Sequence, residues 1–233
     1  MYYDLPSGDP ALSDLCNLAC SNPDLDICHV QHIPSSGDIS KVFPMNWRFF
    51  PTLDPQVKGL IENLSEPLLL SQVDSFLSRD LDSRLNSREA VAVNEFLGTP
   101  HSFHFLRDHP SHGVEVLGSG WGARLGPHNS IVRKLFRESF MKASHDYVFW
   151  AERKSWGPDQ NFLNRYIWPW ARLSSLSHDS YSCNKFPNTR PFPTRRESGP
   201  NNFVAAVVEV GVSLQEPCPV ECRPSNHQDW VTC

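Results

Sequence analysis

The chain has 233 residues and a formal net charge of −5, with 20% charged and 39% hydrophobic residues. This length suits one α/β domain better than two, and the composition is that of an ordinary globular protein. The negative charge argues against a nucleic-acid partner, because phosphate binding needs a dominant basic surface. No apolar run has the length of a membrane span, so the sequence predicts no transmembrane segment.

Short elements are predicted in the first third of the chain. Residues 2–5 have the pattern of a strand end, residues 12–19 place leucines at helical spacing, and residues 27–33 predict a second strand. The aromatic, proline-bounded stretch 43–51 is expected to be an ordered loop packed on the core. Residues 58–73 interrupt an otherwise continuous segment, and we interpret them as an insertion with no chemistry of its own.

From residue 75 onward, strands and helices are predicted to alternate. Asn86 is an N-cap candidate with Glu89 three residues later, which is the spacing of a capping box. The predicted elements are a strand at 75–77, a helix at 86–97, strands at 103–106 and 114–117, helices at 131–147 and 158–167, and a buried strand at 203–208. This alternation predicts an α/β fold with a mostly parallel sheet.

The cysteines lie in two terminal groups with one residue between them: Cys16, Cys20 and Cys28, then Cys183, then Cys218, Cys222 and Cys233. Disulfides formed in an oxidising compartment are favoured, because neither group has the paired spacing of a zinc ribbon. A zinc site remains the alternative, since His29 or His227 could complete a set of four ligands. The cysteines indicate the secretory pathway, whereas the N-terminus has no signal-peptide pattern; because of this conflict we expect the start of the protein to lie upstream. Residues 211–233 form a Cys- and Pro-rich tail, and the basic run 190–196 is interpreted as a solvated loop.

Asp80 and Asp82 form the strongest candidate site, because they directly follow a predicted strand. Carboxylates at positions i and i+2 can reach one cation, and oxygen ligands suit Mg²⁺ or Mn²⁺. Such a metal can hold a diphosphate and stabilise the charge that develops on a nucleoside diphosphate leaving group. The flanking Arg79 and Arg84 can pair with phosphate. Taken alone, the motif also fits a solvated turn before a helix.

A second group of polar and small residues could recognise a substrate. Arg107 and Asp108 end a predicted strand, which fits either recognition of sugar and phosphate or a salt-bridged strand end. Gly120 would let a sugar approach the backbone, and Trp121 would offer an indole face for stacking. The candidate substrate-binding residues are Arg79, Arg107, Asp108, Gly120 and Trp121.

Four motifs also occur in a characteristic order: Asp80-Leu81-Asp82, Gly118-Ser119-Gly120-Trp121-Gly122, Trp156-Gly157-Pro158-Asp159-Gln160-Asn161-Phe162-Leu163-Asn164, and His178-Asp179-Ser180. This order resembles the GT-A-fold glycosyltransferases related to glycogenin and the lipopolysaccharide galactosyltransferases, over about residues 2 to 205. More closely, residues 78–86 and 105–110 resemble a little-described set of predicted transferases found in animals and bacteria.

The resemblance implies a three-layer GT-A-like sandwich over residues 1–210 that lacks the first strand. Asp80 and Asp82 would bind Mn²⁺ or Mg²⁺, and His178 would complete the metal site. Asp159 and Gln160 would lie at the anomeric carbon, where the neutral Gln160 amide suits transfer with retention and Asp159 is the alternative nucleophile. Without the resemblance, His178 fits a histidine at the surface or one that supports a metal ligand. Asp159 then fits an ordinary helix start, because a carboxylate in the first turn interacts favourably with the helix dipole.

The expected function is metal-dependent transfer of a hexose from a nucleotide-diphosphate sugar to a glycan or protein acceptor, in the secretory pathway and specifically the Golgi lumen. Two alternatives remain open. One is a truncated, catalytically inactive transferase that acts as a binding module. The other is a phosphohydrolase that uses an Asp-x-Asp motif at the end of a strand. The match to that class is poor, because Ser78-Arg79 precedes the motif here and Ser83-Arg84 follows it.

Overall fold

The computed structural model describes residues 2–25, 27–33, 38–53, 74–126, 130–145, 157–208, 211 and 213–233. The predicted insertion at 58–73 lies outside the described residues, as do Trp156 and the end of the helix predicted at 131–147.

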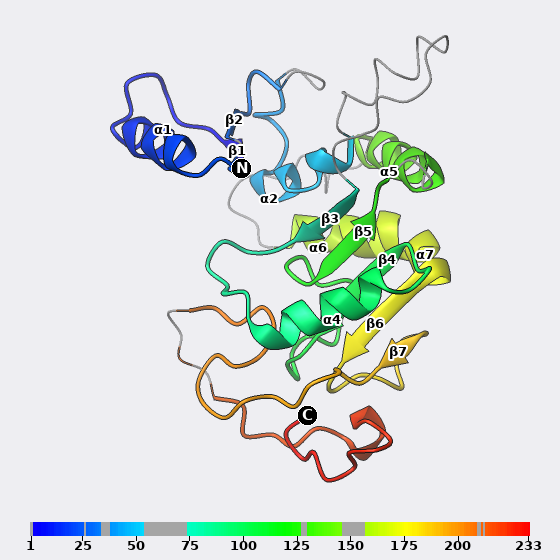
Figure 1. The fold of residues 1–233 in the computed structure, drawn as a ribbon. Coiled ribbons are helices and arrows are strands. Elements are labelled where there is room, and N and C mark those ends of the chain that lie inside the picture. The colour runs from blue at the N-terminus through cyan, green and yellow to red at the C-terminus, as the bar shows by residue number, and fades with distance from the viewer. Residues whose placement is uncertain are drawn as a thin grey trace.

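A mixed sheet lies at the centre of the molecule (Figure 1). Among the described residues it has five strands, in the order β3-β5-β4-β6-β7. They are β3 (Ser75–Ser78), β4 (Phe103–Arg107), β5 (Trp121–Arg124), β6 (Ser175–Asp179) and β7 (Thr189–Arg190). β5 is antiparallel to β3 and β4, whereas β6 is parallel to β4 and β7. β3, β4, β6 and β7 therefore run in one direction, and their carboxyl ends meet at one edge of the sheet.

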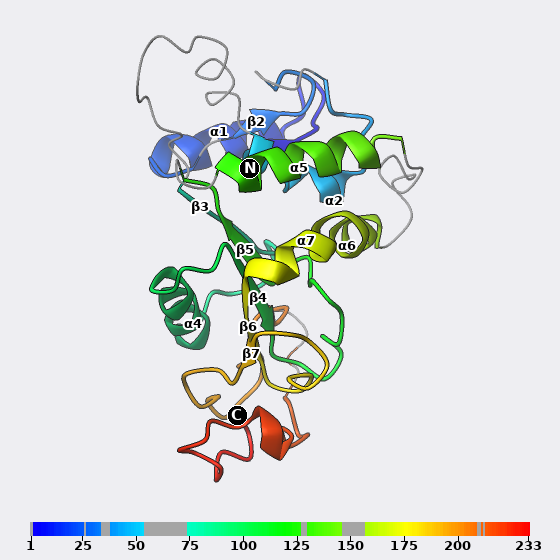
Figure 2. The ribbon, with the colours of Figure 1, turned by 90° about the vertical axis from the view of Figure 1, so that its right-hand side faces the viewer.

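Helices cover both faces of this sheet (Figure 2). One face carries α4 (Ser87–Leu97), whose N-cap Asn86 accepts a hydrogen bond from the backbone N–H of Glu89, as the capping spacing predicts. The other face carries α5 (Ser130–Ala143), α6 (Pro158–Phe162), the π-helix η5 (Leu163–Ile167), α7 (Trp168–Ala171) and the short 3-10 helix η6 (Arg172–Ser174). The predicted α/β class, with a largely parallel sheet, is confirmed.

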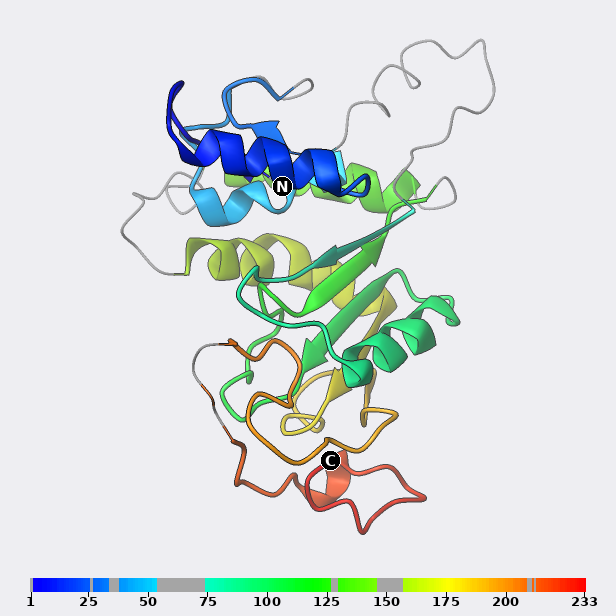
Figure 3. The same cartoon turned by 60° about the vertical axis from the view of Figure 1, so that its left-hand side comes forward.

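The N-terminal residues contain a second, two-stranded sheet, and they pack on the main hydrophobic core (Figure 3). β1 (Tyr2–Tyr3) pairs in parallel with β2 (Cys28–His29), and α1 (Ala11–Ser21) connects them, close to the elements that the sequence predicts. The stretch 43–51 is not the predicted loop, because it forms α2 (Pro44–Trp47) and begins the 3-10 helix η1 (Phe50–Leu53). Its aromatic side chains are nevertheless buried in the core, as expected.

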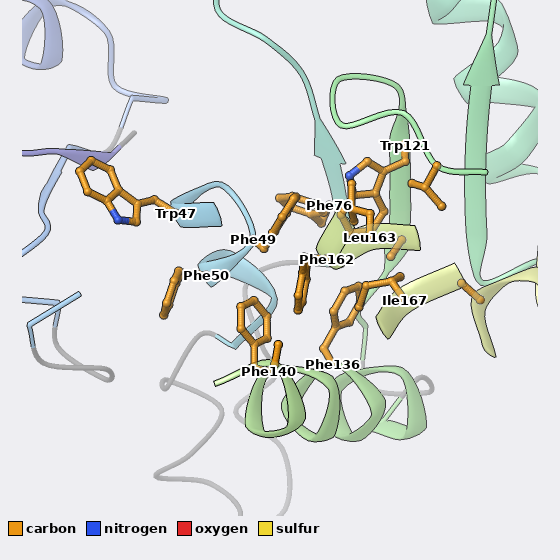
Figure 4. Close-up of a cluster of buried hydrophobic side chains, with 14 of the residues drawn as sticks. Trp47, Phe49, Phe50, Phe76, Trp121, Phe136, Phe140, Phe162, Leu163 and Ile167 are labelled. Carbon is orange, nitrogen blue, oxygen red and sulfur yellow. The ribbon is translucent and has the colours of Figure 1, made fainter. Parts of the chain in front are cut away.

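The largest hydrophobic core lies between η1, α5, α6, η5 and the sheet (Figure 4). Phe49 stacks on Phe162 with ring centroids 5.4 Å apart, and Phe76 lies edge-on to Trp121 at 5.2 Å. Such pairs stabilise a core by about 0.5–1.5 kcal/mol beyond the burial of their area. Trp121 is completely buried among these rings.

The strand predicted at 114–117 is wrong, because the strand of this region is β5, which begins at Trp121. The side chains of Arg107 and Gln160 donate hydrogen bonds to the carbonyl oxygens of residues 114–116. Backbone groups that side chains satisfy in this way do not need a neighbouring strand. The apolar segment therefore runs as a loop across the edge of the sheet.

The buried strand predicted at 203–208 is also wrong. The segment forms turns and has a single antiparallel bridge, between Val207 and Ser83. Ala205 has a φ of 64°, which lies outside the strand region of backbone conformations. By contrast, β6 has the polar sequence Ser-Leu-Ser-His-Asp, and the sequence analysis predicts no strand there.

The described residues include two disulfides, Cys183–Cys222 and Cys218–Cys233, which confirms the predicted cross-linking of the tail. The tail contains one short 3-10 helix, η7 (Val220–Cys222). The three N-terminal cysteines are free thiols: Cys16, Cys20 and Cys28.

In the part of the chain that the structure describes, no helix combines the length and the apolar character that a membrane span requires.

Candidate functional site

The acidic motif follows β3, at the edge where the parallel strands end. Asp80 accepts a hydrogen bond of 2.6 Å from Arg48 Nη1, and the Arg48 and Asp80 side chains are 19% and 34% exposed. Arg48 directly follows α2, so this ion pair joins the N-terminal part of the chain to the end of β3. Asp82 is exposed, and its backbone carbonyl accepts a hydrogen bond of 2.9 Å from the N–H of Val208. Asp82 therefore lies at the surface, two residues after Asp80 in the chain.

Asp159 lies close to this ion pair, although it is far from Asp80 in the sequence. It occupies the first turn of α6, which begins with Pro158 after Gly157 in the left-handed region at φ 97°. A Cβ added to Gly118 would lie 3.0 Å from Asp159 Oδ2 and 3.8 Å from Arg48 Nη1. Gly118 therefore lies directly against both charged groups, where any larger residue would crowd the Asp159 carboxylate.

The charges around Gly118 do not balance. Burial raises the pKa of Asp159, while Arg48 and the backbone N–H of Gln160 lower it and the negative charge of Asp80 raises it further. The net effect is a raised pKa, because burial outweighs the single guanidinium. Two carboxylates and one guanidinium leave a net negative charge in a partly buried place, and this charge favours a cation.

Mg²⁺ and Mn²⁺ prefer oxygen ligands, and carboxylates are among the oxygen-bearing side chains at this edge. Such an ion is commonly bound by one or two carboxylates, and water and substrate phosphate oxygens complete its shell. Asp80 and the exposed Asp82 can supply these carboxylates. Among the described residues, no group of three or more His, Cys, Asp or Glu side chains is arranged to hold one metal ion. The protein therefore offers part of a coordination shell.

His178 does not lie with these aspartates. It is fully buried in β6, with Nδ1 2.8 Å from His104 Nε2 and Nε2 3.2 Å from Glu95 Oε2 of α4. Burial lowers the pKa of His178, although Glu95 acts in the opposite direction. Both ring nitrogens are thus engaged within the protein, beneath α4.

Gln160 lies next to Asp159, but its amide contacts the backbone of a neighbouring loop. Its Oε1 accepts a hydrogen bond of 3.2 Å from the N–H of Gly118, and its Nε2 donates to the carbonyl of Val116. Nε2 also donates to Asn164 Oδ1 at 3.2 Å. In this arrangement Gln160 holds Gly118 beside Asp159, and so it positions one wall of the site.

Three of the predicted substrate-binding residues pack inside the protein. Arg79 donates to Glu89 Oε1 of α4 and to the carbonyl of Trp121 at 3.3 Å. Trp121 is 0% exposed, so its indole has no face open for stacking. A Cβ on Gly120 would lie 2.7 Å from the carbonyl oxygen of Leu106, so this glycine allows the close approach of β4.

Arg107 makes the salt-bridged strand end that was one of its two interpretations. It is 1% exposed and pairs with Asp179 Oδ2 at 3.4 Å, at the ends of the adjacent strands β4 and β6. Its guanidinium also lies 3.9 Å from the ring centre of Phe186. Burial lowers the pKa of Arg107 to about 10, while Asp179 favours its charged form.

Asp108 is the most heavily bonded side chain of this edge. It is 0% exposed, and it accepts hydrogen bonds from Arg88 at 2.9 and 3.0 Å, Ser180 at 2.5 Å, Arg196 at 2.6 Å and the N–H of Val204 at 3.0 Å. Burial by itself raises the pKa of Asp108, but Arg88 and Arg196 outweigh it, and the net pKa is lowered. The predicted solvated loop is therefore wrong for Arg196, which is buried against Asp108.

Arg48 and His104 were not predicted from the sequence as members of these clusters, whereas Gly118 belongs to the Gly-rich motif that the sequence does show. Arg48 was part of an aromatic stretch that carries no functional motif, and its partner lies 32 residues away in the chain. The one local signal was its charge among buried aromatic residues, since a buried charge requires a partner.

Comparison of the chain with models of protein families, with curated proteins and with solved structures found no match.

Proposed function

We propose that the chain is a metal-dependent glycosyltransferase domain of the GT-A type, which transfers a hexose from a nucleotide-diphosphate sugar to a glycan or protein acceptor. One observation carries the proposal: Asp80, Gly118 and Asp159 come from three separate motifs, and the fold brings them together around Arg48. If Asp80 lay in an ordinary solvated turn before a helix, its position close to Gly118 and Asp159 would have no explanation.

Each residue has a role that its surroundings support. Asp80, with Asp82 beside it in the chain, would hold Mn²⁺ or Mg²⁺, which supplies charge stabilisation for a diphosphate leaving group. Arg48 can pair with a phosphate oxygen. Asp159 lies beside Gly118, and its carboxylate would stabilise positive charge on the sugar or attack the anomeric carbon. Because the Gln160 amide is engaged with the backbone, we favour Asp159 as the reacting group.

The disulfides support a location in an oxidising compartment. We place the proposed activity in the secretory pathway, in the Golgi lumen.

The proposal is tested by titrating Mn²⁺ together with UDP into the full chain and into matched variants. Asp80→Asn and Asp82→Asn each remove one carboxylate and should weaken binding about tenfold or more, because each charge-assisted contact contributes roughly 1.5–3 kcal/mol. Asp24→Asn makes the same change at an exposed position near the N-terminus and should leave binding unchanged. Equal binding by all three variants would contradict the proposal.

A second candidate is a module that binds the nucleotide sugar without transferring it. The engagement of His178 and Gln160 within the protein favours it, because neither residue is free to act on a substrate. UDP release from UDP-glucose and UDP-galactose, measured with and without added acceptors, separates the two. Metal and UDP binding without any release would identify the module. Phosphate release without nucleotide-sugar binding would identify the phosphohydrolase.

A further inference from the structure

A groove lies between the segment 190–193, which begins in β7, and the disulfide-linked tail. In Figure 1 the tail lies at the opposite end of the molecule from β3, which the acidic motif follows. It has a volume of about 500 Å³, within the range of roughly 300–1,000 Å³ that is typical of small-molecule sites. Arg190 of β7 and Phe192 line it from the body of the protein. The tail, drawn in red in Figure 1, forms the opposite wall.

The tail wall is held rigidly from within. Arg223 donates to the carbonyl of Cys218 at 3.0 and 3.2 Å and to that of Gln228 at 2.9 Å. The Gln228 amide in turn donates to the carbonyls of Arg223 and Pro224. The disulfides fix both ends of this segment. A wall fixed in this way loses little conformational freedom when a ligand binds.

An aromatic pair stands on this wall. The rings of His227 and Trp230 stack with centroids 4.2 Å apart and an interplanar angle of 12°. Both residues line the groove, and both are partly exposed. Apart from Trp230, the described tryptophans lie in or against the hydrophobic core: Trp47, Trp121, Trp168 and Trp170. A partly exposed indole at a groove wall presents an apolar surface together with an N–H donor.

The charged side chains of the groove are Arg190, Arg223 and Glu221, and their charges balance once Glu95, the partner of Arg190, is counted. Arg190 pairs with Glu95 at 2.8 Å while remaining 51% exposed, and Glu221 accepts a hydrogen bond from Asn184. The guanidinium of Arg223 is directed to the tail backbone. The groove therefore offers an aromatic surface and mixed hydrogen-bond donors and acceptors, without an excess of either charge. This combination suits a neutral polyhydroxylated ligand better than a phosphate or an acidic peptide.

We propose that this groove binds carbohydrate, with a pyranose ring packed against Trp230 and its hydroxyl groups bonded to Arg190, Glu221 and Asn226. The site is separate from Asp80 and needs neither metal nor nucleotide. If the proposed transferase function holds, the groove would keep a glycan on the enzyme independently of the reacting centre.

The test uses the full chain with its disulfides intact, in EDTA and without nucleotide. Lactose, maltotriose, mannotriose and N,N′-diacetylchitobiose are titrated, and binding is followed by saturation-transfer NMR and by tryptophan fluorescence. We expect at least one of them to bind, and Trp230→Ala to weaken that binding about tenfold or more. Trp230→Phe, which keeps a ring, should retain most of it. Leu173→Ala, at a position 77% exposed outside the groove, is the control.

Two variants distinguish carbohydrate binding in this groove from donor binding at Asp80. Trp230→Ala should leave the Mn²⁺ and UDP titration unchanged, and Asp80→Asn should leave oligosaccharide binding unchanged. The proposal is overturned if none of the four oligosaccharides binds, or if their binding is equal in Trp230→Ala and Leu173→Ala. It is also overturned if a proline-rich peptide, rather than a sugar, competes for Trp230.

Discussion

Asp108→Asn keeps the shape of a fully buried side chain, removes its charge and turns one of its acceptor oxygens into a donor. Arg88 and Arg196, each with a side chain 5% exposed, would then lie buried without their counter-ion. Ser180 and the N–H of Val204 also donate to this carboxylate, so an amide cannot satisfy all of its neighbours. We expect the substitution to act on stability, because none of these partners belongs to the candidate site around Gly118.

The expected loss follows from these contacts. Removing one partner of a buried ion pair costs about 3–5 kcal/mol, because it leaves an uncompensated charge. Domains have a total stability of about 5–15 kcal/mol, so the change would remove a large share of it. For a chain of this size, each kcal/mol shifts the melting temperature by about 2–4 °C, which predicts a fall of about 6–20 °C.

Urea denaturation of the oxidised protein, followed by circular dichroism, measures the change. Asp82→Asn is the matched control, because Asp82 is exposed and surface substitutions usually stay within about 0.5 kcal/mol. Equal denaturation midpoints for the two variants would refute the structural role of Asp108. A loss of nucleotide-sugar affinity without a loss of stability would restore the interpretation of Asp108 as a substrate-binding residue.

Three further changes test other parts of the fold. Gly120→Ala should destabilise the protein by about 1–3 kcal/mol in thermal denaturation, because its Cβ would lie 2.7 Å from the backbone oxygen of Leu106; an unchanged melting temperature would contradict this. Replacing both Cys183 and Cys222 with Ser should lower the free energy of unfolding in urea by about 2–4 kcal/mol, since the bond closes a loop between residues 39 apart; a variant of equal stability would count against it. Burial lowers the pKa of His112 from 6.5 to about 4, so the unfolded chain binds the proton more readily. Its contribution to stability, at most roughly 3 kcal/mol, should be present above pH 6.5 and lost as the pH falls to about 4, and His112→Gln should flatten the measured pH dependence in this window. An identical pH profile for this variant would contradict the assignment.

Much of the secondary structure was predictable, because local signals agreed with the final packing. The capping residue Asn86 and the apolar spacing after it predict α4, and the apolar run at 103–106 predicts β4. The strand β6 could not be found in this way, since it is polar in sequence and buried by its position between two strands. The segments 114–117 and 203–208 are apolar in sequence but form no strand. Side-chain hydrogen bonds in the first and turns in the second replace the hydrogen bonds to a neighbouring strand.

Only part of the candidate site was predictable from the sequence. The motif order indicated that Asp80 and Asp159 belong together, and the fold brings them close. The position of His178 depends on the pairing of β6 with β4, and a shift of one residue would turn its side chain to the opposite face. That register is set by long-range contacts, so no local pattern in the sequence specifies it. Arg48 was missed for the same reason.

The Cys183–Cys222 bond also affects how the Asp108 cluster forms. It closes a covalent ring in which Arg196 and Val204, two partners of Asp108, are contained. Even when the rest of the chain is unfolded, the ring keeps these residues near Ser180, a third partner of Asp108, and so raises their effective concentration there. The ring tethers only this side of the cluster, because Asp108 and Arg88 lie outside it; in a reduced chain Arg196 and Val204 are linked to Ser180 by the backbone alone.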